Sequence, residues 1–209
     1  YAACCFPEKF AYTREHTLPP ITNTEIDEAV NWQLGTIFPF NPQDLYADWK
    51  LISQTGTETR IVISAVNRKL IDSLVASCNA AGIKPLSFES SASALARSFK
   101  EIPPSALIIE IDNFGSTITL VEQGISSITA TTNFSRAANS EALLTDISAS
   151  VSQLKTKTGD QQVSVYATGE KAVDEIIAAI SSQINQPVNR LGADQVPSSF
   201  QSAYIEGIS

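Results

Sequence analysis

Apolar residues in the first half of the chain recur with the period of a strand in some segments and of a helix in others. Residues 2–6 and 10–17 have the pattern of two strands joined by a Pro-Glu turn. From Thr22, the order Thr-Asn-Thr-Glu predicts a capping box, and the apolar residues that follow recur on one helical face. Pro39 and Pro42 should end this helix, because proline cannot continue the hydrogen-bond ladder.

The pattern then predicts a hairpin and two more helices. Residues 45–52 alternate, residues 60–66 are rich in β-branched side chains, and a glycine lies between these segments, which predicts an antiparallel hairpin. Asn67 should cap a helix that carries apolar residues on one side and closes at Gly82. A further helix is predicted from residue 91 to residue 99.

A composition break at Pro103-Pro104 predicts the domain boundary, which divides the chain into residues 1–102 and 103–209. The pattern beyond it predicts a strand meander, followed by helices that alternate with strands. The expected elements are strands 106–111, 116–121 and 125–132, a helix that ends near residue 159, strand 163–167, helix 171–184, strand 187–191 and helix 200–205. The second half is therefore α/β in class, and the first half is α+β.

Charge and composition disfavour several classes of function. The net charge of −8 supplies no positive field for phosphate groups, so a nucleic-acid partner is not expected. No segment approaches the roughly 18 apolar residues of a membrane span, so direct membrane insertion is not expected. His16 is the only histidine and has no ligand partner near it in sequence. Cys4, Cys5 and Cys78 fit reduced, buried thiols better than a disulfide framework or a zinc site.

Several segments resemble, in the right order, the PilM family of type IV pilus assembly proteins. They cover nearly the whole chain, and their collinear order is more specific than any one segment. The segments are FPEKFAYTREHTLPP, TEIDEAVNWQLGTIFPFNPQDLYADWKLI, VNRKLIDSLVASCNAAGIKPLSFESSASALARSF, ALIIEIDNFGSTITLVEQGISSITATTNFSR and VSVYATGEKAVDEIIAAISSQINQPVNRL.

The resemblance implies an actin-like (ribonuclease H-like) core with an inserted small αβ subdomain, present here in part. Residues 1–102 would then hold the inserted subdomain and the return helices to the first core subdomain. Residues 103–209 would form the second core subdomain. The chain begins at Tyr1 and contains no methionine, so we expect a fragment whose first phosphate hairpin lies upstream.

The phosphate segment of the family carries Asp-x-Gly and then Thr or Ser, because a carboxylate holds magnesium while glycine lets backbone amides approach phosphate. Two registers are open. One places Glu110 and Asp112 in the Asp and Gly positions with Ser116 after them, and the other uses Asp112, Gly115 and Thr117. Asp112 is the residue that we expect at the magnesium ion if nucleotide binds.

This segment departs from the family pattern in ways that predict a degenerate site. Glu110 and Asp112 should face the same side of one strand, where an extra carboxylate would repel phosphate; a solvated strand end has the same pattern. In the adenosine turn, Thr168-Gly169-Glu170-Lys171, only Gly169 remains to border adenosine. We therefore expect no cofactor and no working ATPase, with ATP and magnesium as the alternative.

Trp32, Phe38, Phe40 and Trp49 form an aromatic group around the first predicted helix. Core packing is the ordinary role of such residues. The resemblance adds a second role, because in the family a groove between the inserted subdomain and the core accepts a short peptide from a membrane partner. Trp32, Phe38 and Phe40 are the residues that we expect to anchor it.

The leading hypothesis is a cytoplasmic scaffold or adaptor, peripheral to the inner membrane, that binds the tail peptide of a PilN-like partner in a type IV pilus assembly machine. The alternative is an actin-like ATP-dependent switch or ATPase that uses the phosphate and adenosine segments. A scaffold of type II secretion or of cell division is a third interpretation. The sequence gives no evidence on the oligomeric state.

Overall fold

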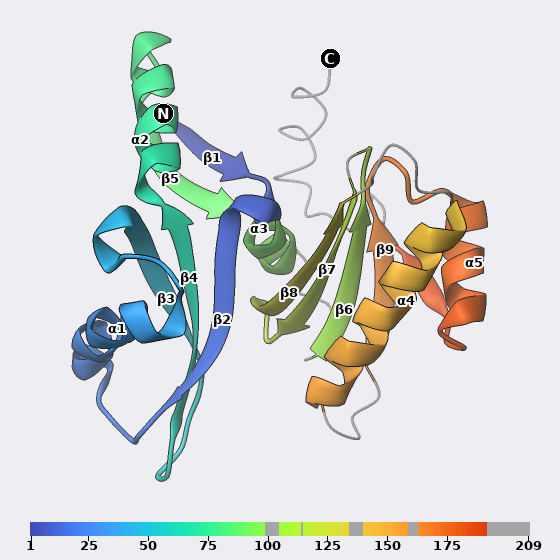
Figure 1. The fold of residues 1–209 in the computed structure, drawn as a ribbon, viewed down its shortest axis with the longest axis horizontal. Coiled ribbons are helices and arrows are strands. Elements are labelled where there is room, and N and C mark those ends of the chain that lie inside the picture. Colours follow the sequence, from blue (N-terminus) through green and yellow to red (C-terminus); the bar gives the residue numbers. More distant parts are fainter. Residues whose placement is uncertain (99–104, 114, 134–139, 159–162, 192–209) are drawn as a thin grey trace. The chain divides into compact units, whose positions relative to one another are not determined.

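The computed structural model describes residues 1–98, 105–113, 115–133, 140–158 and 163–191 (Figure 1). The chain divides into two compact units, Tyr1–Ala94 and Leu95–Ser209. The predicted boundary between residues 102 and 103 lies outside the described residues, as does the predicted helix 200–205.

The first unit holds two sheets and two helices, followed by a third helix that runs into the second unit. Its elements are β1 (Ala2–Phe6), β2 (Ala11–Leu18), α1 (Asn23–Ile37), β3 (Leu45–Gln54), β4 (Thr59–Asn67), α2 (Arg68–Ala80), β5 (Pro85–Ser90) and α3 (Ser91–Ser98), with short 3-10 turns at Glu8–Phe10 and Pro42–Asp44. The predicted capping box is confirmed: Glu25 Oε2 accepts from the Thr22 backbone N–H at 2.8 Å and from Thr22 Oγ1 at 2.7 Å.

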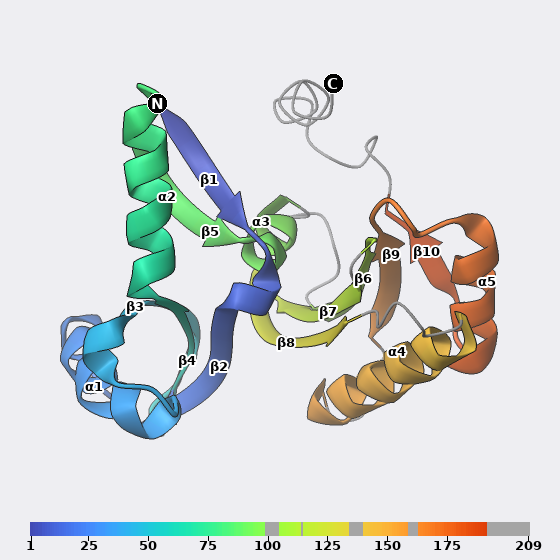
Figure 2. The ribbon, with the colours of Figure 1, turned by 45° about the horizontal axis from the view of Figure 1, so that its top comes forward.

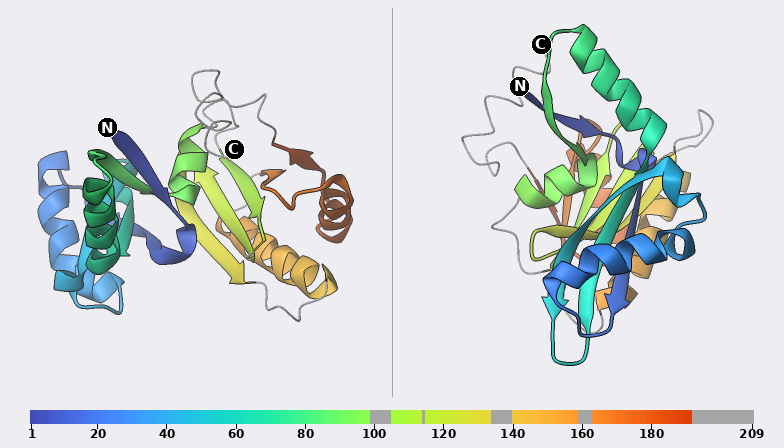
Figure 3. Two further views of the ribbon diagram at one scale, coloured as in Figure 1. Left: turned by 90° about the horizontal axis from the view of Figure 1, so that it is seen from above. Right: turned by 90° about the vertical axis from the view of Figure 1, so that its left-hand side faces the viewer.

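The larger sheet of this unit is antiparallel, in the order β2-β4-β3, so the predicted hairpin of β3 and β4 is confirmed. Helix α1 lies against this sheet (Figure 3). Its apolar residues recur at helical spacing and meet the inward-facing residues of the strands, which closes a small core. The fully buried members are Leu18, Ile26, Val30, Leu34, Phe38, Leu45, Ile61, Ile63 and Ala65.

The smaller sheet consists of β1 and β5, which pair in parallel. The sequence pattern predicts strand β1 but not β5, which begins at Pro85. The two strands at the start of the chain therefore belong to different sheets: β1 pairs with β5, and β2 pairs with β4. Helix α2 lies beside β1 and β5 (Figure 2) and contains no fully buried residue.

The second unit is built around a five-stranded sheet in the order β10-β9-β6-β7-β8. The predicted meander is confirmed as antiparallel pairs of β6 with β7 and of β7 with β8, while β9 runs parallel to β6 on its other side. Within the described residues of this unit, the remaining elements are two helices and a 3-10 turn. The bounds are β6 (Ser105–Ile111), β7 (Gly115–Glu122), β8 (Ile125–Asn133), α4 (Ser140–Lys155), a 3-10 turn at Thr156–Thr158, β9 (Ser164–Thr168), α5 (Asp174–Gln183) and β10 (Val188–Arg190).

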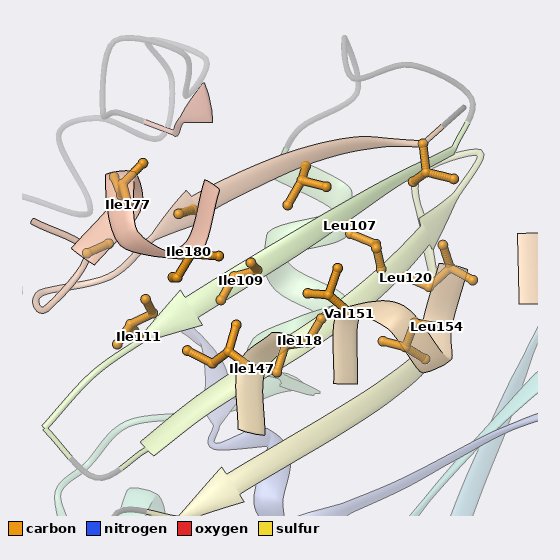
Figure 4. Packing of buried hydrophobic residues seen from close by; sticks show 14 of the residues in the cluster. Leu107, Ile109, Ile111, Ile118, Leu120, Ile147, Val151, Leu154, Ile177 and Ile180 are labelled. Atoms are coloured by element: carbon orange, nitrogen blue, oxygen red, sulfur yellow. The ribbon is translucent and has the colours of Figure 1, made fainter. Parts of the chain in front are cut away.

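Helices α4 and α5 cover one face of this sheet and bury its main core (Figure 4). Ile109 and Ile118 of the central strands and Ile147 of α4 have no exposed surface. The opposite face packs on α3, where Ala96 lies against Ile108 and Val121. This face matters for the candidate site, because Glu110 alternates with the core residues of β6 and belongs to it.

Candidate functional site

Two turns meet at one edge of the five-stranded sheet. Strands β6 and β9 are parallel neighbours, with Glu110 beside Thr168, so the turns that follow them lie at the same edge. The backbone N–H of Lys171 donates to the Ile111 carbonyl at 3.0 Å, which ties the second turn to the end of β6. Helix α5 consequently begins at Asp174, three residues later than predicted, because residues 171–173 form part of this turn.

Gly169 packs directly on the backbone of β6. Its φ of +101° is in the left-handed region, and a Cβ at this position would lie 2.3 Å from the Ile111 carbonyl oxygen. Both facts require glycine here. The packing of Gly169 against the β6 backbone is by itself sufficient to explain why this position is glycine, without a bound purine.

Asp112 forms a closed turn rather than an extension of the strand. It lies just beyond the end of β6, its N–H donates to the Gly115 carbonyl at 3.0 Å, and its Oδ1 accepts from the Gly115 N–H at 2.8 Å. Strand β6 ends at Ile111, so Glu110 lies in the strand and Asp112 lies in the turn that follows it. The Gly115 amide, which could cradle a phosphate, already serves the Asp112 carboxylate.

A side-chain bridge connects the two turns. Asn113 Nδ2 donates to Glu170 Oε2 at 2.7 Å. The bridge holds the Glu170 carboxylate at Asn113, the residue that follows Asp112 in the first turn. Two carboxylates at this edge favour a cation and repel a triphosphate.

The remaining predicted site residues lie on different faces of the sheet. Glu110 pairs with Thr117 across β6 and β7 and faces the α3 side. Ser116 is 4% exposed, faces the opposite side, and lies with its Oγ 2.6 Å from Thr132 Oγ1 of β8. The structure thus brings Asp112, Gly115 and Gly169 to one edge but does not bring Ser116 and Thr117 together there.

The polar groups at this edge bind one another. The Gly115 amide donates to Asp112, Glu170 accepts from Asn113, and Ser116 Oγ lies at hydrogen-bond distance from Thr132 Oγ1 of the neighbouring strand. Among the described residues, no group of His, Cys, Asp and Glu side chains is arranged to hold a metal ion. The prediction of Asp112 as a magnesium ligand gains no support from this geometry.

The predicted aromatic anchors separate into exposed and buried residues. Trp32 on α1 is 81% exposed and Phe40 is 39% exposed, whereas Phe38 is 2% exposed and belongs to the core. Tyr12 of β2 joins Phe38 to Phe40, with its ring centroid 6.4 Å from the first and 4.5 Å from the second. Phe38 therefore packs in the core, and of the three predicted anchors only Trp32 and Phe40 are accessible to a partner.

A groove of about 330 Å³ opens between α1, β3 and the start of α2. Arg68 forms one wall: its Nε donates to the Gln43 carbonyl and its Nη2 to the Leu45 carbonyl, both at 3.0 Å, and its guanidinium lies 3.9 Å from the Tyr46 ring centroid. The lining residues are Asn31, Leu34, Pro42, Gln43, Leu45, Tyr46, Ala47 and Arg68. The sequence did not identify Tyr46 and Arg68 as groove residues. Their separation in sequence gives no sign that the hairpin contacts the N-terminus of the following helix.

Comparison with solved structures identifies the fold. Over 98% of its length, the chain superposes on 74% of a chain from a PilM-PilN type IV pilus biogenesis complex, with a TM-score of 0.74 at 13% sequence identity. The fold is that of the PilM-type actin-like proteins. The actin-like prediction is therefore confirmed at the level of the fold.

A second structure supports the same fold. The cytoplasmic domain of EpsL, an inner-membrane component of the type II secretion system of Vibrio cholerae, matches 97% of the chain over 71% of its own, with a TM-score of 0.58 at 10% identity. No protein-family model matches the sequence, and no characterised relative is detected by sequence comparison. None of the helices in the described residues is long and apolar enough to cross a membrane.

Proposed function

We propose that this chain is a cytoplasmic scaffold of a type IV pilus or related secretion machine, peripheral to the inner membrane. Its task is to bind a short tail peptide of an inner-membrane partner. The observation that carries the proposal is the superposition on a chain of a PilM-PilN complex over almost the whole of this chain. The similarity to the EpsL cytoplasmic domain supports the broader class of machine.

The surface of the first unit supports peptide binding. An indole that is 81% exposed lies next in sequence to Asn31, which lines the groove. Exposed tryptophan is a common anchor in interfaces, because its large apolar ring gains much from burial. Arg68 keeps its side chain fixed by two backbone carbonyls, so this wall of the groove is formed before a peptide arrives.

Isothermal titration tests this proposal with peptides copied from the cytoplasmic tails of inner-membrane pilus and secretion proteins. A cognate peptide should bind with a dissociation constant on the order of micromolar, and its scrambled version should not bind. Trp32→Ala should weaken binding by about tenfold or more. Leu86→Ala is the matched control, because Leu86 is 66% exposed but belongs to β5, outside the groove. Absence of heat with every tail peptide would refute the proposal.

A nucleotide-dependent switch is the second candidate, and one observation favours it. The turns after β6 and β9 meet at one edge of the sheet, and the second contains Gly169, whose φ lies in the left-handed region. A melting-temperature series with ATP and magnesium at millimolar concentration decides between the candidates. A ligand at a hundred times its dissociation constant stabilises by about 2.7 kcal/mol, so an unchanged melting temperature removes the switch.

A further inference from the structure

Cys4 of β1 and Cys78 of α2 are in direct contact, although 74 positions separate them in sequence. Their sulfur atoms lie 3.9 Å apart, and both side chains are half-buried. Sulfur atoms at this distance leave no room for another group between them. The fold has therefore assembled a dithiol pair that the sequence could not reveal.

The surroundings of the pair leave it within reach of small reagents. Helix α2 has no fully buried residue, and its partner layer consists of strands β1 and β5. Partial burial, then the hydrogen bond and charge of Cys78, raise the pKa of Cys4. Cys5 is exposed and, as the next residue of the strand, points away from Cys78.

We propose that Cys4 and Cys78 form an oxidative modification site, at which hydrogen peroxide converts the two thiols into a disulfide that locks α2 to β1. One sulfur attacks the peroxide oxygen, which breaks the O–O bond and gives a sulfenic acid and water. The second sulfur then attacks the sulfenic sulfur and breaks its S–O bond. The sulfenic hydroxyl takes the proton of the second thiol and leaves as a second water. Two thiols lose two electrons, and the peroxide takes them up.

The crosslink would act on a helix that has no fully buried residue. Helix α2 follows β4 directly, and Tyr46 of β3 donates its hydroxyl to Asp72 of α2 at 3.1 Å. A covalent bond near the other end of α2 would fix the helix at both ends. Oxidation is thus expected to stiffen the connection between the β1–β5 layer and the β2-β4-β3 sheet within this unit.

The test uses the full chain with Cys5→Ser, which leaves Cys4 and Cys78 as its two thiols. After hydrogen peroxide, the intact mass should fall by two hydrogen atoms, thiol titration in denaturant should fall from two groups to none, and peptide mapping should join Cys4 to Cys78. Reducing agent should reverse all three changes. Added oxygen atoms, crosslinks between chains alone, or two thiols still titratable would overturn the proposal.

Two further measurements show whether the fold is responsible. The same reaction in denaturant should be slower by about tenfold or more, because the unfolded chain must close a long loop to bring the sulfurs together. Peroxide should raise the melting temperature of Cys5→Ser but not of the variant that also carries Cys4→Ser. Equal rates in native and denaturing conditions would contradict a preformed pair. These readouts need no tail peptide, so they stand or fall separately from the proposed function.

Discussion

Helices α2 and α4 carry the same kind of amphipathic pattern, yet they are buried to different extents. Helix α4 lies on a five-stranded sheet and has Ile147 and Val151 with no exposed surface. Helix α2 lies beside a two-stranded sheet and has no fully buried residue. A hydrophobic face thus shows which side of a helix packs, while the width of the sheet beneath it decides how much area is buried.

This difference assigns separate roles to the two units. The second unit contains the larger core and the turns with Asp112 and Gly169, which are tied by contacts among their own residues. The first unit contains the exposed aromatic surface, the groove and the dithiol pair. Stability is expected to depend mainly on the second unit, and recognition on the first.

The largest expected effect comes from a pair of core truncations. Ile147→Ala should destabilise the second unit by about 3 to 4 kcal/mol, because it removes a fully buried side chain and leaves a cavity. Leu74→Ala in α2, where the side chain is half-buried, should cost about 1 kcal/mol. Denaturant unfolding of each variant, followed by circular dichroism, measures the difference. Equal losses would remove the contrast between the helices.

Gly169→Ala tests the closed turn. We expect a loss of about 2 to 3 kcal/mol, because the backbone is left-handed and the new Cβ would lie 2.3 Å from the Ile111 carbonyl oxygen. Gly56→Ala is the matched control, since a Cβ there meets nothing within 4 Å. A neutral Gly169→Ala variant in thermal unfolding would mean that the two turns are not packed as described.

Arg68→Ala tests how firmly α2 is attached to β3. The change removes two hydrogen bonds to backbone carbonyls and the stacking on Tyr46, so we expect a loss of about 1 to 2 kcal/mol. Lys69→Ala, at the exposed neighbouring position, should stay within about 0.5 kcal/mol of the parent. Urea unfolding of both variants provides the comparison, and equal midpoints would contradict the role given to Arg68.

The smallest effect concerns Glu25 in the capping box of α1. Hydrogen bonds from the Thr22 hydroxyl and the Thr22 backbone lower the pKa of Glu25. A lowered pKa in the folded state means that the contribution to stability is complete above the unfolded pKa, about 4.3, and is lost as pH falls through the folded value. Melting temperatures from pH 6 to pH 3, taken as approximate limits, should therefore fall less steeply for Glu25→Gln than for the parent. Parallel curves would show that the cap does not titrate.

Local patterns were sufficient for most of the elements. The capping sequence at Thr22, the N-cap Asn67 and the meander after residue 105 all depend on neighbouring residues, and the structure has them as predicted. Strand β5 was missed because its partner, β1, lies at the other end of the first unit in sequence, and local patterns do not show such a pairing. The start of α5 was displaced because the Ile111 carbonyl, distant in sequence, binds the Lys171 amide.

The candidate sites were less predictable for the same physical reason. Asp112, Gly115 and Gly169 were identified from the resemblance, but the Asn113–Glu170 bridge depends on two turns that only the fold brings together. The burial of Phe38 beneath Tyr12 and the contact of Cys4 with Cys78 likewise depend on pairing between distant segments. Sequence spacing carries no information about such contacts.

The most direct test of this division of roles is an NMR titration of the isotope-labelled chain with a tail peptide that binds it. The account predicts that amide shifts change around Trp32, Phe40 and the groove of the first unit, and that the turns containing Asp112 and Gly169 keep their positions in the spectrum. Shifts that concentrate at those two turns, with none around Trp32, would contradict it.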